Sequence, residues 1–397
     1  MSREYGNRGR DQYNFENFQG NVVVENREQP ARPRSEMWIL QQVELEVISR
    51  LEQSLHSKVL ITLGKQKQLE QVKRLWDAEI KIGSKPTEPL LPQTSILEVF
   101  ERAEIAGQLL ILGNPGAGKT TTMLDLGQSL IDKAIQDNSY PIPVLFNLSS
   151  RKDPHQSIPN WLVEELKSKY GVRKDIGKKL MEEKLLLPML DGLDEVKLEH
   201  QELCVHSINQ WLQGDERPLF VVVCSRREEY ANYETRLHLN GAIVLQELTN
   251  EQIQEYLSEV KRFELWQLLQ QDTVLLELVR TPLLLSITFL SYEELSLQRW
   301  QQLTSTKQRI EMLLDAYVQK MSCREIENIA YKKLPPPGAT QTRDWLIFLA
   351  QQLQRESQTE FLIEKMQPSW LATGKQKKHI DGLVGCLVGC FLGCLLP

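Results

Sequence analysis

The chain has 397 residues, 41% of them hydrophobic, which is enough for two or three domains with buried cores. Lys and Arg total 47 and Asp and Glu total 53, so the net charge is −6. This balance argues against a dedicated nucleic-acid binder, and we expect no specific nucleic-acid partner. Half of the six cysteines lie in the last dozen residues and the others are scattered, which indicates a reducing compartment. The N-terminus lacks the apolar stretch of a signal peptide, so we expect a cytoplasmic protein.

The N-terminal part divides into two segments by composition. Residues 1–34 are rich in Asn, Gln, Arg, Glu and Gly, and we predict a disordered lead. From Ser35, a candidate N-cap, apolar residues recur every three or four positions and predict a helix to about residue 57. A Lys- and Gln-rich helix is expected to end near Trp76. Residues 83–89 have the composition of a linker. We interpret 35–85 as an N-terminal helical segment, with a role in effector or partner contact.

The middle of the chain alternates short apolar runs with longer amphipathic stretches, which predicts βαβ units around a buried parallel sheet. We therefore predict an α/β domain over 86–247. Strand signals stop near Thr249, and helical domains are expected over 248–300 and 301–372, with one break at 334–338. The apolar runs predicted as strands are 109–112, 144–146, 185–187, 219–223 and 243–245.

The strongest local signal matches Gly-x-x-x-x-Gly-Lys-[Ser/Thr], the pattern of a phosphate-binding loop, between an apolar run and a helical pattern beginning near Thr121. Glycines let backbone N–H groups converge on phosphate oxygens, and the helix N-terminus adds its positive dipole end. We expect Lys119 to reach the β- and γ-phosphates and the Thr120 hydroxyl to ligate Mg²⁺. The alternative is a glycine-rich turn that contains Lys-Thr by chance. The candidate nucleotide-binding residues are Gly113, Asn114, Pro115, Gly116, Ala117, Gly118, Lys119, Thr120 and Thr121.

A second signal is the acidic cluster that follows the apolar run 185–190. Asp191 at the strand tip is placed to hold Mg²⁺, and Glu195, with Asp194 beside it, to orient or deprotonate the attacking water. The alternative is a solvated acidic turn. Pro188 cannot donate to a sheet ladder, so we expect the regular strand to occupy only part of this run.

A third signal is the group of polar and basic residues, Ser225, Arg226 and Arg227, that follows the apolar run 219–223. A strand over this run would place them at the carboxyl edge of the sheet, where open α/β sheets bind ligands. Arg226 or Ser225 is therefore a candidate sensor of the γ-phosphate. The alternative is that Arg226 and Arg227 pair at the surface with the two glutamates that follow. We expect Cys224 to be a small buried apolar residue.

Together these stretches resemble the NACHT family of signal-transducing P-loop NTPases, within the STAND class. The resemblance covers about residues 86–300 well and continues more weakly to 372. The segments 36–85 and 341–371 look like those of cyanobacterial multi-domain members, which implies a bacterial origin. The stretches that carry the resemblance are LLILGNPGAGKTTT (109–122), LPMLDGLDEV (187–196), VVCSR (222–226), LTNEQI (248–253) and TPLLL (281–285).

The resemblance implies an α/β P-loop NTPase of the ASCE type, followed by a helical and a winged-helix-like domain. Family members are held as ADP-bound monomers and assemble when ATP replaces ADP, and the proline matched by Pro282 packs near adenine. A plain proline at the start of a helix is the equal alternative here. Many members lock ADP with a winged-helix histidine, whereas this chain has no histidine between His238 and His379. Arg309 or Arg324 would have to replace it.

The C-terminal tail, residues 380–397, ends in sixteen residues without a charge, 382–397, in which glycines and cysteines each recur every four positions. Small residues at this spacing let helices approach closely in lipid, but a span needs about 20 residues. We consider a membrane helix cut short, a short anchor or re-entrant segment, and a helix buried against the protein or an oligomer partner.

The sequence therefore predicts a Mg²⁺-dependent switch that binds ATP and ADP, hydrolyses ATP slowly and self-associates in its ATP-bound form. Its role would be regulatory signalling, with bacterial defence as a possible setting and with an unidentified effector or sensor protein as partner. Two alternatives stay open: a P-loop metabolic kinase, and a membrane scaffold with a non-hydrolysing nucleotide site.

Overall fold

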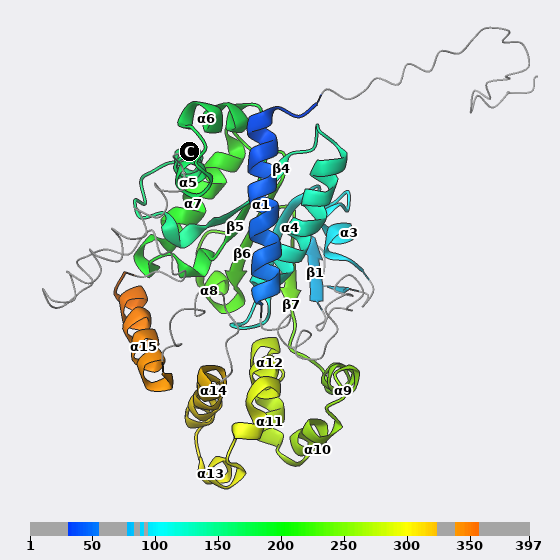
Figure 1. Ribbon diagram of the computed structural model, residues 1–397. Helices are drawn as coiled ribbons and strands as arrows, with labels where there is room; N and C mark the ends of the chain where they lie inside the picture. The colour runs from blue at the N-terminus through cyan, green and yellow to red at the C-terminus, as the bar shows by residue number, and fades with distance from the viewer. Residues whose placement is uncertain (1–30, 55–77, 83–87, 91–93, 324–337, 357–397) are drawn as a thin grey trace, which may run out of the picture.

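The computed structural model describes residues 31–54, 78–82, 88–90, 94–323 and 338–356. Within these residues, the strands form one seven-stranded sheet in the order β2-β1-β7-β3-β6-β5-β4 (Figure 1). The five strands β7, β3, β6, β5 and β4 run parallel to one another, and they are the five apolar runs predicted as strands. The bounds are β1 (Ala78–Ile82), β2 (Glu88–Pro89), β3 (Gln108–Gly113), β4 (Ile142–Asn147), β5 (Leu186–Asp191), β6 (Val221–Arg226) and β7 (Gly241–Leu245).

The edge formed by β1 and β2 differs from the predicted all-parallel sheet. Strand β1 is antiparallel to both β7 and β2, so the sheet is mixed. Residues 78–82 alternate apolar and charged side chains, with Ile80 buried and Lys81 exposed, which is the period of a half-buried strand. The expectation of a helical segment over 35–85 is wrong at this strand. The predicted linker is likewise wrong at Glu88–Pro89, which pair with β1.

Pro188 lies inside β5 and shapes its pairing. On the β4 side the register runs through it for the whole strand, with Val144 opposite Pro188. On the β6 side the described pairs are Met189 with Val222 and Leu190 with Val223, directly after the proline. The strand is therefore complete toward one neighbour and short toward the other, because proline has no N–H to donate.

One face of the sheet is covered by α4 (Lys119–Gln136), which contacts β3, β4, β5 and β6. Helix α1 (Arg34–Gln53) packs against α4 and β4 and buries Ile39, Val43 and Val47 in the same core as the sheet. Its N-cap is Pro33 and not Ser35, which lies in the first turn, and the helix ends at Gln53 before the predicted residue 57. The other helices of this part are α3 (Ile96–Phe100), α5 (Ile158–Tyr170), α6 (Lys174–Glu182), α7 (Gln201–Gln213) and α8 (Arg227–Asn232).

Helices follow β7, as predicted, and lie below the sheet in Figure 1. The first, α9, begins after Thr249, which forms a capping box with Gln252. Whether the last helices form a winged-helix-like domain stays a prediction. Within the described residues no helix is long and apolar enough to cross a membrane, and the apolar tail 382–397 lies outside them. The helices are α9 (Asn250–Glu259), α10 (Phe263–Gln271), α11 (Thr273–Leu278), α12 (Pro282–Ser291), α13 (Leu297–Gln302), α14 (Thr306–Cys323) and α15 (Ala339–Glu356).

Candidate functional site

The predicted phosphate loop connects β3 to α4. β3 ends at Gly113 and α4 begins at Lys119, two residues before the expected start. Gly116 and Gly118 have φ of 76° and 91°, values that favour glycine because other residues lack room for Cβ there. The loop therefore turns the backbone so that the N-terminus of an 18-residue helix opens onto it.

The lysine and the hydroxyl predicted to contact nucleotide both lie at this loop. The Lys119 ammonium donates to the carbonyls of Gly113 (3.1 Å) and Asn114 (3.2 Å). The Thr120 hydroxyl donates to the Asp191 carboxylate at 2.9 Å, across 71 positions of sequence. The fold thus brings together the two oxygen ligands that were predicted for Mg²⁺.

This oxygen pair fits Mg²⁺, which prefers hard oxygen ligands, keeps several waters and needs only one or two carboxylates beside the substrate phosphates. Within the described residues no group of three or more His, Cys, Asp and Glu side chains could hold a metal by itself. Any Mg²⁺ here would therefore rest on Thr120, Asp191, phosphate and water.

Asp194, in the turn after β5, and Arg226, at the end of β6, form an ion pair in which the carboxylate is buried and the guanidinium is partly exposed. One Asp194 oxygen accepts the Arg226 backbone N–H at 2.9 Å, and the other lies 2.8 Å from the guanidinium Nε. The Asp194 side chain is 4% exposed. Both carboxylate oxygens are thus occupied by Arg226, which suits a positioning role better than the water-orienting role expected for Asp194. Arg226 also pairs with Glu229 at 3.3 Å, so the predicted surface pairing is present as well.

Glu195 lies in a tight turn over Gly192. Its backbone N–H donates to the Gly192 carbonyl at 3.0 Å, and a Cβ placed on Gly192 would lie 2.6 Å from a Glu195 carboxylate oxygen. Gly192 has a φ of 73°, so the backbone conformation after Asp191 favours glycine. The buried Gln201 amide donates to the carbonyls of Asp194 and Val196, each at 2.9 Å, and holds this turn. No pattern in the sequence marks Gln201 as part of the site.

Cys224 and Ser225 lie next to each other on β6 and are both buried. The Cys224 sulfur is 3.6 Å from that of Met123 on α4, as expected for a small buried residue. Burial, and the nearby Asp191 carboxylate, raise the pKa of the Cys224 thiol well above its usual value. Ser225 is 0% exposed, whereas the Arg226 side chain is 42% exposed. Of the two candidate phosphate sensors, only Arg226 reaches the surface of the sheet edge.

The start of α12 contacts the outer side of the phosphate loop. The Leu283 backbone N–H donates to the Gly116 carbonyl at 3.2 Å. A Cβ placed on Gly116 would lie 2.9 Å from the Thr281 methyl group and from the Leu283 Cβ. Pro282, between them, is buried and is the first residue of α12, as the alternative of a plain proline at the start of a helix predicts. Two segments that are far apart in sequence therefore meet at Gly116.

The family model of the NACHT domain matches residues 108–264, from the first residue of β3 into α10. This part of the chain is a NACHT domain. It belongs to the nucleotide-binding P-loop NTPases of the signalling kind, which bind nucleotide typically with Mg²⁺. None of the curated proteins matches the chain.

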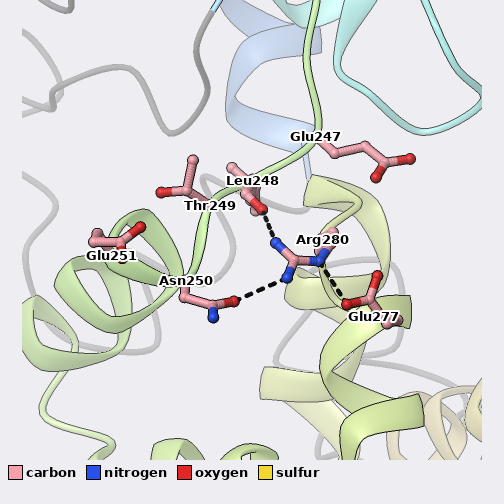
Figure 2. A pocket seen from close by; sticks show the side chains of 7 residues that line it. All are labelled: Glu247, Leu248, Thr249, Asn250, Glu251, Glu277 and Arg280. Atoms are coloured by element: carbon pink, nitrogen blue, oxygen red, sulfur yellow. Dashed lines mark hydrogen bonds and ion pairs between the residues drawn. The ribbon is translucent and has the colours of Figure 1, made fainter.

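A pocket of about 450 Å³ lies where the sheet of the NACHT domain joins the helices (Figure 2). Arg280 crosses it and donates to the Leu248 carbonyl at 3.0 Å and to the Asn250 side chain at 3.1 Å. The Leu248 N–H returns a bond to the Arg280 carbonyl at 2.8 Å. Hydrogen bonds of Arg280 thus join the connection after β7 to the turn that leads into α12. The residues that line the pocket are Glu247, Leu248, Thr249, Asn250, Glu251, Glu277 and Arg280.

Two arginines, Arg309 and Arg324, were predicted as substitutes for a winged-helix histidine, and only the first lies within the described residues. Arg309 donates to the Leu303 carbonyl at 2.9 Å and lies over the Trp300 ring, 5.6 Å from its centroid. It is thus engaged within its own helical neighbourhood. Arg324 lies outside the described residues.

Proposed function

We propose that the NACHT domain binds and slowly hydrolyses ATP, and that exchange of ADP for ATP moves the helices after β7 so that copies of the chain associate. The observation that carries this proposal is the hydrogen bond from the Leu283 N–H to the Gly116 carbonyl. It ties a helix outside the sheet to the backbone of the phosphate loop.

The bond links loop conformation to helix position for a simple reason. Leu283 is the second residue of α12, and the first N–H groups of a helix have no partner within the helix. Here the phosphate loop supplies the acceptor. A change of the loop around phosphate therefore either carries α12 with it or leaves a donor at the start of α12 without a partner. The buried Pro282 is proposed to pack beside the adenine, which makes the preferred nucleotide ATP or ADP.

Hydrolysis would use groups of the phosphate loop, of the end of β5 and the turn after it, and of the end of β6. Lys119 would turn from the loop carbonyls to the β- and γ-phosphates, and Thr120 with Asp191 would hold Mg²⁺, which neutralises phosphate charge when bound. Glu195 would orient or deprotonate the attacking water. Asp194 would keep Arg226 at the sheet edge, where its guanidinium could stabilise charge on the γ-phosphate. Slow turnover suits a switch, because the bound nucleotide then persists long enough to be read.

The proposed role is regulatory signalling by self-association, with bacterial defence as the setting that the family resemblance suggests. An effector or sensor protein would read the assembled form. We propose a cytoplasmic location.

The test compares the wild type with Glu195→Gln and Lys119→Ala in phosphate release and in light scattering with ATP or ADP. We expect slow phosphate release by the wild type and a larger particle in ATP than in ADP. Glu195→Gln should keep binding and assembly but lower turnover roughly a hundredfold or more, because a positioned general base contributes about this much. Lys119→Ala should abolish both responses.

Three results would contradict the proposal in different ways. Rapid phosphoryl transfer to a small acceptor would indicate a metabolic kinase. A rise in melting temperature with nucleotide but no phosphate release over hours would indicate a nucleotide-stabilised scaffold. Equal particle size in ATP and ADP would remove the switch while leaving the NTPase in place.

A further inference from the structure

Helix α1 has a second apolar face that points away from the core. Its buried side chains, among them Ile39, Val43 and Val47, pack against α4 and β4. Figure 1 shows the helix at the front of the molecule, outside α4. An ordinary surface helix carries polar residues on its outer face. On α1 the large apolar residues of that face are Met37, Trp38, Leu45 and Ile48, which are 46%, 53%, 62% and 37% exposed.

The outer face has the spacing of a coiled-coil seam. Counting from Arg34, the residues on it follow one another at intervals of four, three, four, three and four, which is the heptad pattern of positions a and d. At 100° per residue this stripe lies opposite the buried one. The seam consists of Arg34, Trp38, Gln41, Leu45, Ile48 and Glu52.

The charges at the two ends of the seam are unfavourably placed for an isolated helix. Arg34 is the first residue of α1, where the helix dipole disfavours a positive charge, and Glu52 lies in its last turn, where it disfavours a negative one. Both side chains are exposed, and neither forms an ion pair in the described part of the chain. A partner that presents the opposite order of charge would compensate both ends.

We propose that this outer face pairs with the same face of a second copy of the chain, with the two α1 helices antiparallel about a two-fold axis at the level of Val43. In this register Arg34 of each copy faces Glu52 of the other, Trp38 faces Ile48, and Gln41 faces Leu45. A two-fold interface must be complementary to itself, and this stripe is, because each pair of facing residues is equally spaced from Val43. Parallel pairing would place Arg34 against Arg34 and Glu52 against Glu52.

The charged ends determine the length and direction of the seam. Arg34 and Glu52 are separated by about 27 Å along the helix axis, so both ion pairs form only when the full helices overlap. The polar Gln41 near the centre favours one register over slipped alternatives. Glu44 lies beside the two-fold axis, so the Glu44 carboxylates of the two copies would lie close together and repel each other. Glu44→Gln removes this repulsion and is expected to strengthen the pairing.

The experiment measures the mass of the full-length chain in solution over a range of concentrations, by sedimentation equilibrium. We expect a dimer for the wild type and at least tenfold weaker association for Leu45→Glu, which places a charge at the centre of the seam. Phe263→Glu is the matched control, because Phe263 is 59% exposed on α10, away from α1, and its replacement should leave the mass unchanged. Nucleotide binding and thermal melting of each variant verify that it is folded.

The charge exchange tests the direction of pairing. Arg34→Glu and Glu52→Arg should each weaken the dimer, and the double variant should restore it. Singles that match the wild type would overturn the antiparallel register. A monomeric wild type, or a dimer unaffected by Leu45→Glu, would overturn the proposal itself. Chains lacking residues 1–30 or 380–397 that dimerise when the wild type does not would show that a segment of the same chain covers the face instead.

The pairing does not depend on the proposed switch. Lys119→Ala should form the same dimer, and the dimer should be present in ADP and in ATP. A dimer that appears only with ATP would mean that the face responds to the nucleotide cycle and would contradict the constitutive seam. Failure of the switch proposal, by contrast, would leave the α1 result unchanged.

Discussion

The two ends of helix α4 show opposite solutions to the same problem. Every α-helix leaves N–H groups at its start and carbonyl groups at its end without partners inside the helix. At the start of α4 these N–H groups open onto the phosphate loop, whose lysine lies over loop carbonyls. At the end of α4, the buried guanidinium of Arg32, which precedes α1, donates to the Ala134 carbonyl. One end is arranged to receive an anion and the other is closed by the protein itself.

The closed end depends on Arg32. Its Nη2 atom lies within 3.1 Å of the carbonyl oxygens of Ala134, Asp137 and Tyr140, and its Nη1 lies 3.6 Å from the Glu36 carboxylate. Burial lowers the pKa of the Arg32 guanidinium and raises the pKa of the Glu36 carboxyl, with each charge partly offsetting the effect on the other. The same helix therefore serves binding at one end and stability at the other. Variants at the two ends should therefore separate these properties.

The largest effect is expected at the closed end. Arg32→Ala leaves Glu36 buried without its partner, since the two side chains are only 3% and 9% exposed, and removes the donor to three carbonyls. We expect a loss of about 3–5 kcal/mol in the free energy of unfolding, measured by urea denaturation. Nucleotide affinity of the folded protein should stay within about twofold of the wild type.

The control for this change is Arg173→Ala, which breaks an ion pair whose side chains are 76% and 63% exposed and should not shift the urea midpoint measurably. Adding Glu36→Gln to Arg32→Ala should recover part of the loss, because it removes the buried unpaired charge. An Arg32→Ala midpoint equal to that of the wild type would show that the end of α4 does not need this cap.

The next effect is expected at the open end and on the other property. Lys119→Ala removes the positive charge that would meet the phosphates, and we expect roughly a hundredfold weaker binding of Mg-ATP, or about 2.7 kcal/mol, by calorimetry. The unfolding midpoint without nucleotide should change little, because the hydrogen bonds that Lys119 forms within the described residues go to carbonyls of its own loop. Lys133→Ala is the matched control on the last turn of the same helix. Unchanged affinity in Lys119→Ala would remove the phosphate-loop assignment.

Much of the sheet and of the open end was predictable because each depends on local signals. Uniformly apolar runs predicted the five parallel strands, and the glycine pattern located the loop before α4. The antiparallel edge was missed because β1 is short and follows a stretch that looks helical. The Thr120–Asp191 contact was expected from the two motifs, whereas the Asp194–Arg226 pair required the order of β5 and β6 in space.

The closed end and the junction were not predictable, for one physical reason. Arg32, Gln201 and Arg280 all bond backbone carbonyls that are distant in sequence or in turns of unpredictable geometry. A carbonyl is present at every residue, so nothing in the sequence marks which one an arginine or glutamine will find. Only the folded backbone selects them.

The smallest effect is expected at Arg280, which supports the open end of α4 indirectly. Its guanidinium holds the connection after β7 against the turn before α12, and α12 in turn bonds Gly116 of the phosphate loop. The Arg280 side chain is 23% exposed, so water replaces part of what is lost. Arg280→Ala should lower the free energy of unfolding by about 1 kcal/mol and weaken ATP binding less than tenfold, while binding of tripolyphosphate stays the same. Arg299→Ala, an exposed arginine on α13, is the control. If Arg280→Ala weakened tripolyphosphate as much as ATP, the hydrogen bonds of Arg280 would act on the loop itself. If both ligands bound more weakly by the same factor, phosphate binding at the open end of α4 would depend on the distant Arg280, just as the stability of the closed end depends on Arg32.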